Sequence, residues 1–260
     1  MSISGFGDWL ASSQGQYVLA WEQARFDHVV ADIFGFNAIQ IGLPQCQFLR
    51  ANRMPLRLTC DTTEGSPRGT TEGSPRGTSV GADVMSAAGV RSDMHHLPFA
   101  SNSVDLVVLP HVLEFSETPH QVLREVERVL VPEGHVVIAG FNPYSLWGIK
   151  RRMAGSGADF PWRGQYLGVR RMKDWLTLLG FETQAGCFGC YIPPVTQEKW
   201  LRRLDFMELA GNRWWPIAGA TYLVQGIKRQ HGLRLLTPVW QDRKARARAL
   251  SPAIQRIEEQ

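Results

Sequence analysis

The sequence lacks several features that would place it outside ordinary globular proteins. No apolar run reaches the roughly 18 residues that a membrane-spanning helix needs. The N-terminal stretch MSISGFGDWLASSQGQ has neither the basic start nor the apolar stretch of a secretory signal. Four cysteines in 260 residues are too few for a disulfide framework. We therefore expect a cytoplasmic protein without a membrane span, built as one domain with extensions.

Metal ligands are also scarce. Cys187 and Cys190 form a CxxC motif that could share a metal ion or cycle as a redox pair, but a zinc site needs four ligands and no second CxxC or HxxxH is present. His95 and His96 are adjacent, so in a strand they would point to opposite faces. The pattern favours two half-buried thiols, and we expect no metal site.

Acidic residues are rare near the C-terminus. Residues 228–256 hold eight Lys or Arg against one acid, Asp242. Such a stretch could attract nucleic acid, but charge blocks at chain ends are usually solvated. We expect a basic, flexible tail over 229–260, with nucleic acid as a weakly supported partner.

One segment cannot form a core. Residues 62–77 are the octapeptide TTEGSPRG written twice, rich in glycine, proline and charge. A longer surface loop costs little free energy, because closure entropy grows only logarithmically with length. We expect a mobile, dispensable loop.

The rest of the chain alternates short apolar segments with amphipathic ones. The helical spacing of Val122, Val126 and Val129 is the clearest example. The pattern predicts helices over residues 14–33, 45–52, 119–131 and 169–179. It predicts strands over residues 36–42, 55–60, 89–92, 104–110, 134–140, 181–189 and 220–228. Strands separated by helices indicate a mostly parallel sheet that is covered on both faces. Its ligand would sit beyond the carboxyl ends of the strands.

Residues 92–143 carry a family resemblance. An Asp followed by LPF, the strand VDLVVLP and the helix REVERVLVPEG resemble the second half of a class I S-adenosylmethionine-dependent methyltransferase of the type 11 kind. SLWGIKRRM and WLTLLGFET, further along, are similar to a branch of uncharacterised proteobacterial proteins with an irregular first motif. The resemblance implies an α/β, Rossmann-like, seven-stranded methyltransferase sheet.

The resemblance also implies a domain organisation and an activity. The methyltransferase-like domain would cover 36–228, after an N-terminal helical extension over 1–35 and with substrate-side insertions at 143–175 and 190–218. S-adenosylmethionine would be the cofactor. The methyl acceptor, a small molecule or a macromolecule, is not identified by the sequence.

The first family motif is altered in AIQIGLPQC, residues 38–46. Only Gly42 matches the three glycines of the family, because Pro44 and Cys46 stand at the other two places. Gln40 stands where the family commonly has an acid. Proline removes an amide donor and adds a ring, so the loop must approach a cofactor differently.

The resemblance assigns further residues to the cofactor. Asp61 would hold the ribose hydroxyls, and Asp93 would accept a hydrogen bond from the adenine amino group. Met94 would lie against the adenine ring, with Leu109 and Pro110 near the methionine part.

Two alternatives stay open. His111, after the fourth strand, could orient a substrate or act as a base, or it could satisfy loop carbonyls. Glu114 is a weaker site candidate, and Asp105 is interpreted as structural. The altered loop also leaves open a catalytically inactive protein of the same fold that acts as a binding or scaffolding module.

Overall fold

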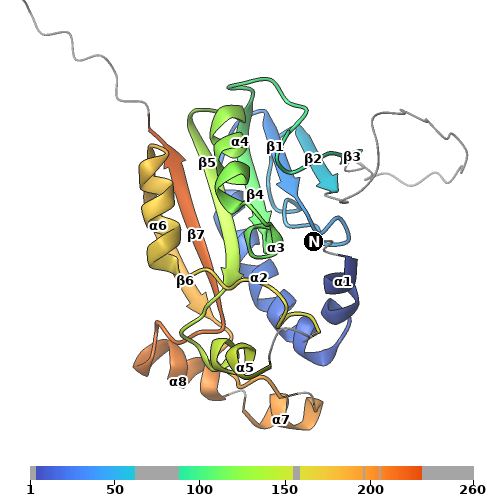
Figure 1. Cartoon of the computed structure of the whole chain (residues 1–260), viewed down its shortest axis with the longest axis vertical. Helices are drawn as coiled ribbons and strands as arrows, with labels where there is room; N and C mark the ends of the chain where they lie inside the picture. The colour runs from blue at the N-terminus through green and yellow to red at the C-terminus, as the bar shows by residue number, and fades with distance from the viewer. Residues whose placement is uncertain (1–3, 62–87, 155–158, 196, 205, 230–260) are drawn as a thin grey trace, which may run out of the picture. The chain divides into compact units, whose positions relative to one another are not determined.

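The computed structural model describes residues 4–61, 88–154, 159–195, 197–204 and 206–229 (Figure 1). The repeat at 62–77 and residues 230–260 of the expected tail lie outside the described residues. Among the described residues, no helix is long and apolar enough to cross a membrane.

A seven-stranded sheet forms the centre of the fold, in the order β3-β2-β1-β4-β5-β7-β6. All neighbours pair in parallel except β7, which is antiparallel to both β5 and β6. The strands are β1 (Asn37–Ile41), β2 (Leu56–Asp61), β3 (Ala88–Arg91), β4 (Val104–Pro110), β5 (Leu130–Phe141), β6 (Phe181–Gly189) and β7 (Thr221–Lys228). This sheet confirms the predicted α/β, Rossmann-like class.

Helices cover both faces of the sheet (Figure 1). They are α1 (Ser4–Leu10), α2 (Ser13–Ala31), α3 (Val112–Phe115), α4 (Pro119–Val129), α5 (Leu146–Ala154), α6 (Val169–Leu178), α7 (Glu198–Arg203) and α8 (Phe206–Trp214). The expected helix over 119–131 ends two residues early, because β5 already begins at Leu130.

Strand β4 divides its side chains between two hydrophobic clusters. Leu106 and Val108 pack in the cluster that contains α2, whereas Val107 and Leu109 pack in the cluster that contains α4 and α6. Successive side chains of a strand point to opposite faces, so the apolar run LVVLP of this strand, residues 106–110, is buried on both sides.

The N-terminal helices α1 and α2 belong to the same compact unit as the sheet. Phe6 and Leu10 of α1, and Phe26 of α2, are buried in the core. The expected insertions contain α5 in the first and α7 and α8 in the second. Asp105 has the structural role expected of it, because its Oδ2 accepts hydrogen bonds from the Phe36 and Asn37 backbone N–H groups, both at 2.9 Å.

Candidate functional site

The strand order changes direction between β1 and β4, which are neighbours at the centre of the sheet. In open α/β sheets the ligand crevice lies beyond the carboxyl ends of the strands at such a point. Gly42, Asp61, Asp93 and Pro110 stand at or just after the ends of β1, β2, β3 and β4, in that order. The structure therefore brings these four predicted residues to one edge of the sheet.

The loop after β1 is a tight turn. Gly42 has a φ of 81° and its N–H donates to the Cys60 carbonyl at 2.8 Å. Leu43 also has a positive φ, 48°, and Pro44 is exposed while Cys46 is buried. The predicted helix over 45–52 is wrong, since the described backbone there consists of turns and no helix.

The Gln40 side chain binds backbone groups of this loop. Its buried side-chain amide donates to the carbonyls of Gly42, Leu43 and Cys46, at 3.1, 2.9 and 2.8 Å. Its Oε1 accepts from the Phe48 N–H at 3.0 Å. The Leu43 carbonyl also accepts from the Cys46 N–H at 3.0 Å, so the side chain adds to a backbone turn. Gln40, which stands where the family commonly has an acid, thus fixes the conformation of the loop after β1 through its side chain.

Replacing Gln40 by leucine should lower the free energy of unfolding by about 2–3 kcal/mol, because buried loop groups lose their partners. Denaturant unfolding of both proteins measures this difference. Gln47→Leu, an exposed change in the same loop, is the matched control and should stay within about 0.5 kcal/mol. An equal loss in both variants would contradict the anchoring role of Gln40.

Asp93 presents a partly exposed carboxylate at the end of β3. Its side chain is 58% exposed. Its Oδ1 accepts from the His95 N–H at 2.9 Å and contacts His95 Nδ1 at 2.9 Å, and its Oδ2 lies 3.4 Å from His96 Nδ1. The bond from the His95 N–H is the largest of the effects that lower the pKa of this carboxyl group. Both histidines therefore turn toward one carboxylate, where strand geometry would have separated them.

The other predicted cofactor residues are more deeply placed. Met94 and Leu109 are buried in the core, and Asp61 is half-buried as the last residue of β2. Ser92, next to Asp93 in the chain, has a buried hydroxyl that interacts with the Cys60 thiol. The edge thus offers the Asp93 carboxylate to a ligand.

His111 lies in a buried cluster with two carboxylates. Its Nδ1 lies 2.8 Å from Glu114 Oε2, and its Nε2 lies 2.7 Å from Glu22 Oε1 of α2. Burial alone would lower the pKa of His111, but the charges of Glu22 and Glu114 and their hydrogen bonds outweigh it and raise the pKa to about 10. The ring holds its proton near neutral pH and both nitrogens are occupied. This arrangement favours a structural role for His111 over the predicted base.

Glu114 connects this cluster to the next strand. Its Oε1 accepts from the Phe141 N–H, at the end of β5, and burial raises the pKa of its carboxyl group. His111 itself has a φ of 55°, a left-handed conformation that is uncommon for a residue other than glycine. Outliers of this kind cluster at functional sites.

Helix α1 covers the same edge of the sheet. Phe6 is fully buried, and its ring centroid lies 5.2 Å from that of His111 and 5.3 Å from that of Phe115. A side chain at Gly7 would come within 3.0 Å of the Gln45 amide in the loop after β1. Helix α1 lies within the expected helical extension over 1–35 but before the predicted helix over 14–33, and its sequence signal is Phe6, Trp9 and Leu10 between glycines and a single acid.

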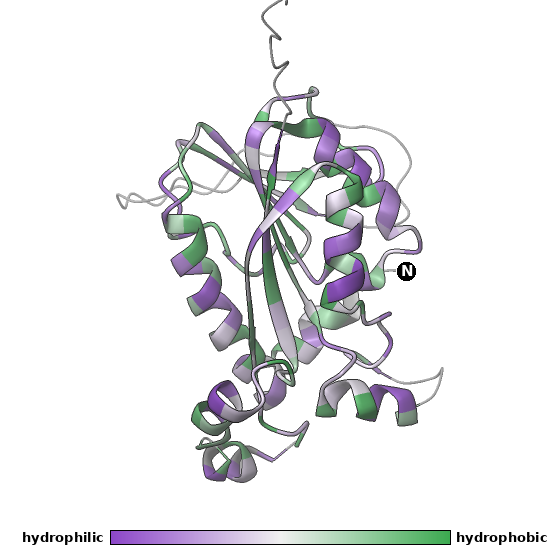
Figure 2. Cartoon of the chain, turned by 90° about the vertical axis from the view of Figure 1, so that its left-hand side faces the viewer, coloured by the Kyte–Doolittle hydropathy of each residue, from purple (hydrophilic) through white to green (hydrophobic). Residues whose placement is uncertain are grey.

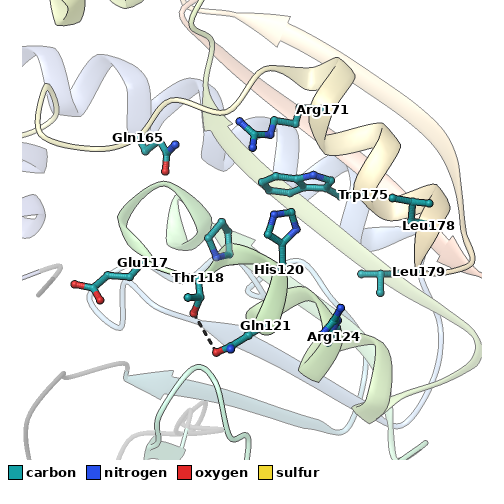
Figure 3. A pocket seen from close by; sticks show the side chains of 11 residues that line it. Glu117, Thr118, His120, Gln121, Arg124, Gln165, Arg171, Trp175, Leu178 and Leu179 are labelled. Carbon is teal, nitrogen blue, oxygen red and sulfur yellow. Dashed lines mark hydrogen bonds between the residues drawn. The ribbon is translucent and has the colours of Figure 1, made fainter.

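A groove of about 650 Å³ lies between α4 and α6 (Figure 3). The Arg171 guanidinium lies 4.9 Å from the centroid of the Trp175 indole, and the His120 ring centroid lies 3.8 Å from it. Thr118, at the rim, contacts His95 Nε2 at 2.8 Å through its Oγ1. Thr118 thus connects the groove with Asp93 through His95, whose Nδ1 lies 2.9 Å from Asp93 Oδ1.

The CxxC thiols are free. Burial raises the pKa of both Cys187 and Cys190, so neither is a ready thiolate. No group of three or more potential metal ligands gathers in the part of the chain that the structure describes.

The sequence is similar to known methyltransferases. Residues 68–138 match the family described as "Methyltransferase domain". The chain is 42% identical over 93 residues to the uncharacterized protein YafS of Escherichia coli K12, covering 36% of this chain and 39% of that protein. It is 27% identical over 151 residues to a malonyl-[acyl-carrier protein] O-methyltransferase of Laribacter hongkongensis, covering 58% of this chain and 48% of that one. The chain thus spans less than half the length of these curated relatives.

Solved structures share the fold. A chain of the Haloferax volcanii complex that contains the Trm112 methyltransferase activator superposes with a TM-score of 0.59 at 17% identity, over 89% of this chain and 99% of that one. A SAM-dependent methyltransferase from Archaeoglobus fulgidus gives 0.53 at 17% identity, over 81% and 94%. The chain thus contains a segment similar to the methyltransferase domain family, and it shares its fold with solved S-adenosylmethionine-dependent methyltransferases.

Proposed function

We propose that this chain binds S-adenosylmethionine at the carboxyl ends of β1 to β4 and transfers its methyl group to an acceptor. One observation carries the proposal: the ends of these four neighbouring strands hold Gly42, Asp61, Asp93 and Pro110, and the Asp93 carboxylate is partly exposed. The similarity to relatives named malonyl-[acyl-carrier protein] O-methyltransferase supports methyl transfer without identifying the acceptor of this chain.

The residues present fit such a ligand. Asp93 offers a partly exposed anionic acceptor to an amino group. Gly42 has no side chain, so the backbone at the end of β1 can approach a ligand closely. The Gln40 side chain holds this loop in one conformation. A pre-organised backbone lowers the entropic cost of binding.

The chain's own chemical task would be modest. When bound, S-adenosylmethionine would supply an activated methyl group, so the acceptor's nucleophile would displace sulfur directly in one in-line step. Since both nitrogens of His111 are engaged, its part would be to hold the end of β4 in place and not to remove a proton. The acceptor would have to arrive as a nucleophile or lose its proton to water or to another group.

Two observations favour a second candidate, a binding or scaffolding module without activity. Phe6 of α1 packs against His111 at the end of β4, and Gln40 ties the loop after β1 shut. Both features reduce the space that is left for a ligand at the carboxyl ends of the strands. Calorimetric titration of the full chain with S-adenosylmethionine distinguishes the two, because micromolar affinity supports the enzyme and no heat at millimolar ligand supports the module.

The double change Pro44→Gly and Cys46→Gly tests the altered loop. In a working site we expect it to weaken binding or barely alter it, because Cys46 is buried and two glycines add unfolded-state entropy. Calorimetry on wild type and variant provides the comparison. A silent wild type whose variant gains affinity would show a blocked pocket and would overturn the enzymatic assignment.

A further inference from the structure

The exposed large hydrophobic side chains are unevenly distributed. Of fourteen among the described residues, ten fall in two stretches, 144–153 and 200–217. Trp214 and Trp215 are 70% and 62% exposed. Single exposed apolar residues are ordinary, but a concentration of this kind marks an interaction surface.

Two helices in these stretches present their apolar side chains outward. On α5, Leu146, Ile149 and Met153 are exposed, and their spacing of three and four residues places them on one side of the helix. Trp147 and Gly148, on the other side, are buried. On α8, Phe206 and Leu209 are exposed at the same spacing. We call these two rows the apolar stripes.

The stretches that carry the stripes lie close together. Figure 1 shows α5, α7 and α8 at the end of the sheet toward which β4 and β5 point. Lys150 Nζ of α5 donates to the Pro194 carbonyl at 3.0 Å, just before α7. Asn142, just before α5, donates through Nδ2 to the Ile217 carbonyl at 2.7 Å, just after α8. This is also the edge that holds the candidate cofactor site.

The same stretches are basic. Residues 144–153 and 200–217 together contain six Lys or Arg and two acids. Arg152, Arg203 and Arg213 are exposed, and none of the three forms an ion pair with another described residue. Glu208 faces inward, where it accepts hydrogen bonds from the Tyr191 N–H at 2.8 Å and from the Tyr17 hydroxyl.

We propose that the apolar stripes, with Trp214 and Trp215, dock on the surface of a bilayer that contains anionic lipid. Tryptophan and tyrosine concentrate at the level of the lipid headgroups. Each Lys or Arg near an anionic surface adds about 1 kcal/mol of attraction. Short amphipathic helices of this composition lie in the interface and do not cross it. Docking of this face turns the carboxyl edge of the sheet toward the membrane.

Co-sedimentation with vesicles tests the docking in the absence of any methyl donor, so its outcome is independent of the proposed function. The full chain is mixed with two kinds of vesicle. The first consists of phosphatidylcholine alone and has little surface charge, and the second contains about one third phosphatidylglycerol and is strongly anionic. We expect about tenfold or stronger partitioning to the anionic vesicles, weakened by salt. Failure to bind anionic vesicles would overturn the proposal.

Matched variants locate the contact. Trp214→Ser combined with Trp215→Ser should reduce binding about tenfold or more, because the buried aromatic area is lost. Leu178→Ser removes a side chain that is 83% exposed on α6, outside the stripes, and should leave binding unchanged. Circular dichroism verifies that each variant is folded.

Three results would contradict the docking. Equal loss of binding in both variants would mean that any apolar surface suffices. Vesicle binding that is unchanged by the Trp214→Ser, Trp215→Ser double change would assign the contact to another segment, such as the basic stretch 228–256. A dimer in sedimentation velocity that the same pair abolishes would show a second copy of the chain covering this face.

Discussion

Replacing His111 by alanine is expected to lower the free energy of unfolding by about 3–5 kcal/mol, because a buried ion cluster loses its central partner. Glu22 and Glu114 would then lie in a buried site without the imidazolium between them. Denaturant unfolding near pH 7 measures the loss. His28→Ala, on the exposed side of α2, is the control and should change stability by about 0.5 kcal/mol or less.

The same cluster should give the wild type a characteristic pH dependence. The folded-state pKa of His111, about 10, lies above its ordinary value of 6.5. The folded state therefore holds the proton more tightly than the unfolded state, and this stabilisation is full below about pH 6.5 and lost as pH rises toward 10. Melting temperatures should fall across this interval, and less steeply in His111→Ala. A parallel fall in both proteins would contradict the assignment.

Replacing Asp93 by alanine should weaken S-adenosylmethionine binding about ten- to hundredfold, while the fold stays intact. A hydrogen bond to a charged group contributes about 1.5–3 kcal/mol, and this carboxylate is more than half exposed, so few packing contacts are lost. Calorimetry measures the affinity and thermal unfolding measures the fold.

Two further variants sharpen this prediction. Asp93→Asn keeps one carbonyl acceptor, so its loss of affinity should be smaller than that of alanine. Asp174→Ala, an exposed acid on α6, should leave the affinity unchanged. An unchanged titration curve for folded Asp93→Ala would remove Asp93 from the site.

The sheet was predictable because its signals are local. The predicted strands 104–110 and 181–189 match β4 and β6 residue for residue. Strand β4 lies inside the sheet, and its largely apolar run between turn residues is enough to predict it. The valine spacing of 119–131 likewise predicted α4, and all three valines are fully buried.

The site was less predictable because its contacts are distant in sequence. Gln40 was visible only as a departure from the family acid, and its hold on the loop depends on a turn that periodicity cannot show. The partner of His111, Glu22, lies 89 residues earlier in the chain. The ligand roles of Asp61, Asp93, Met94, Leu109 and Pro110 stay predictions.

The alternation of side chains along β4 has a consequence for how the protein comes apart. Leu106 and Val108 belong to one hydrophobic cluster and Val107 and Leu109 to the other, so β4 separates the two clusters. Neither cluster can unfold while the other stays folded, because displacing β4 exposes the apolar side chains of both clusters to water. The sheet and its two helical layers should therefore open as one cooperative unit, with the amide protons of β4 among the last to exchange with solvent.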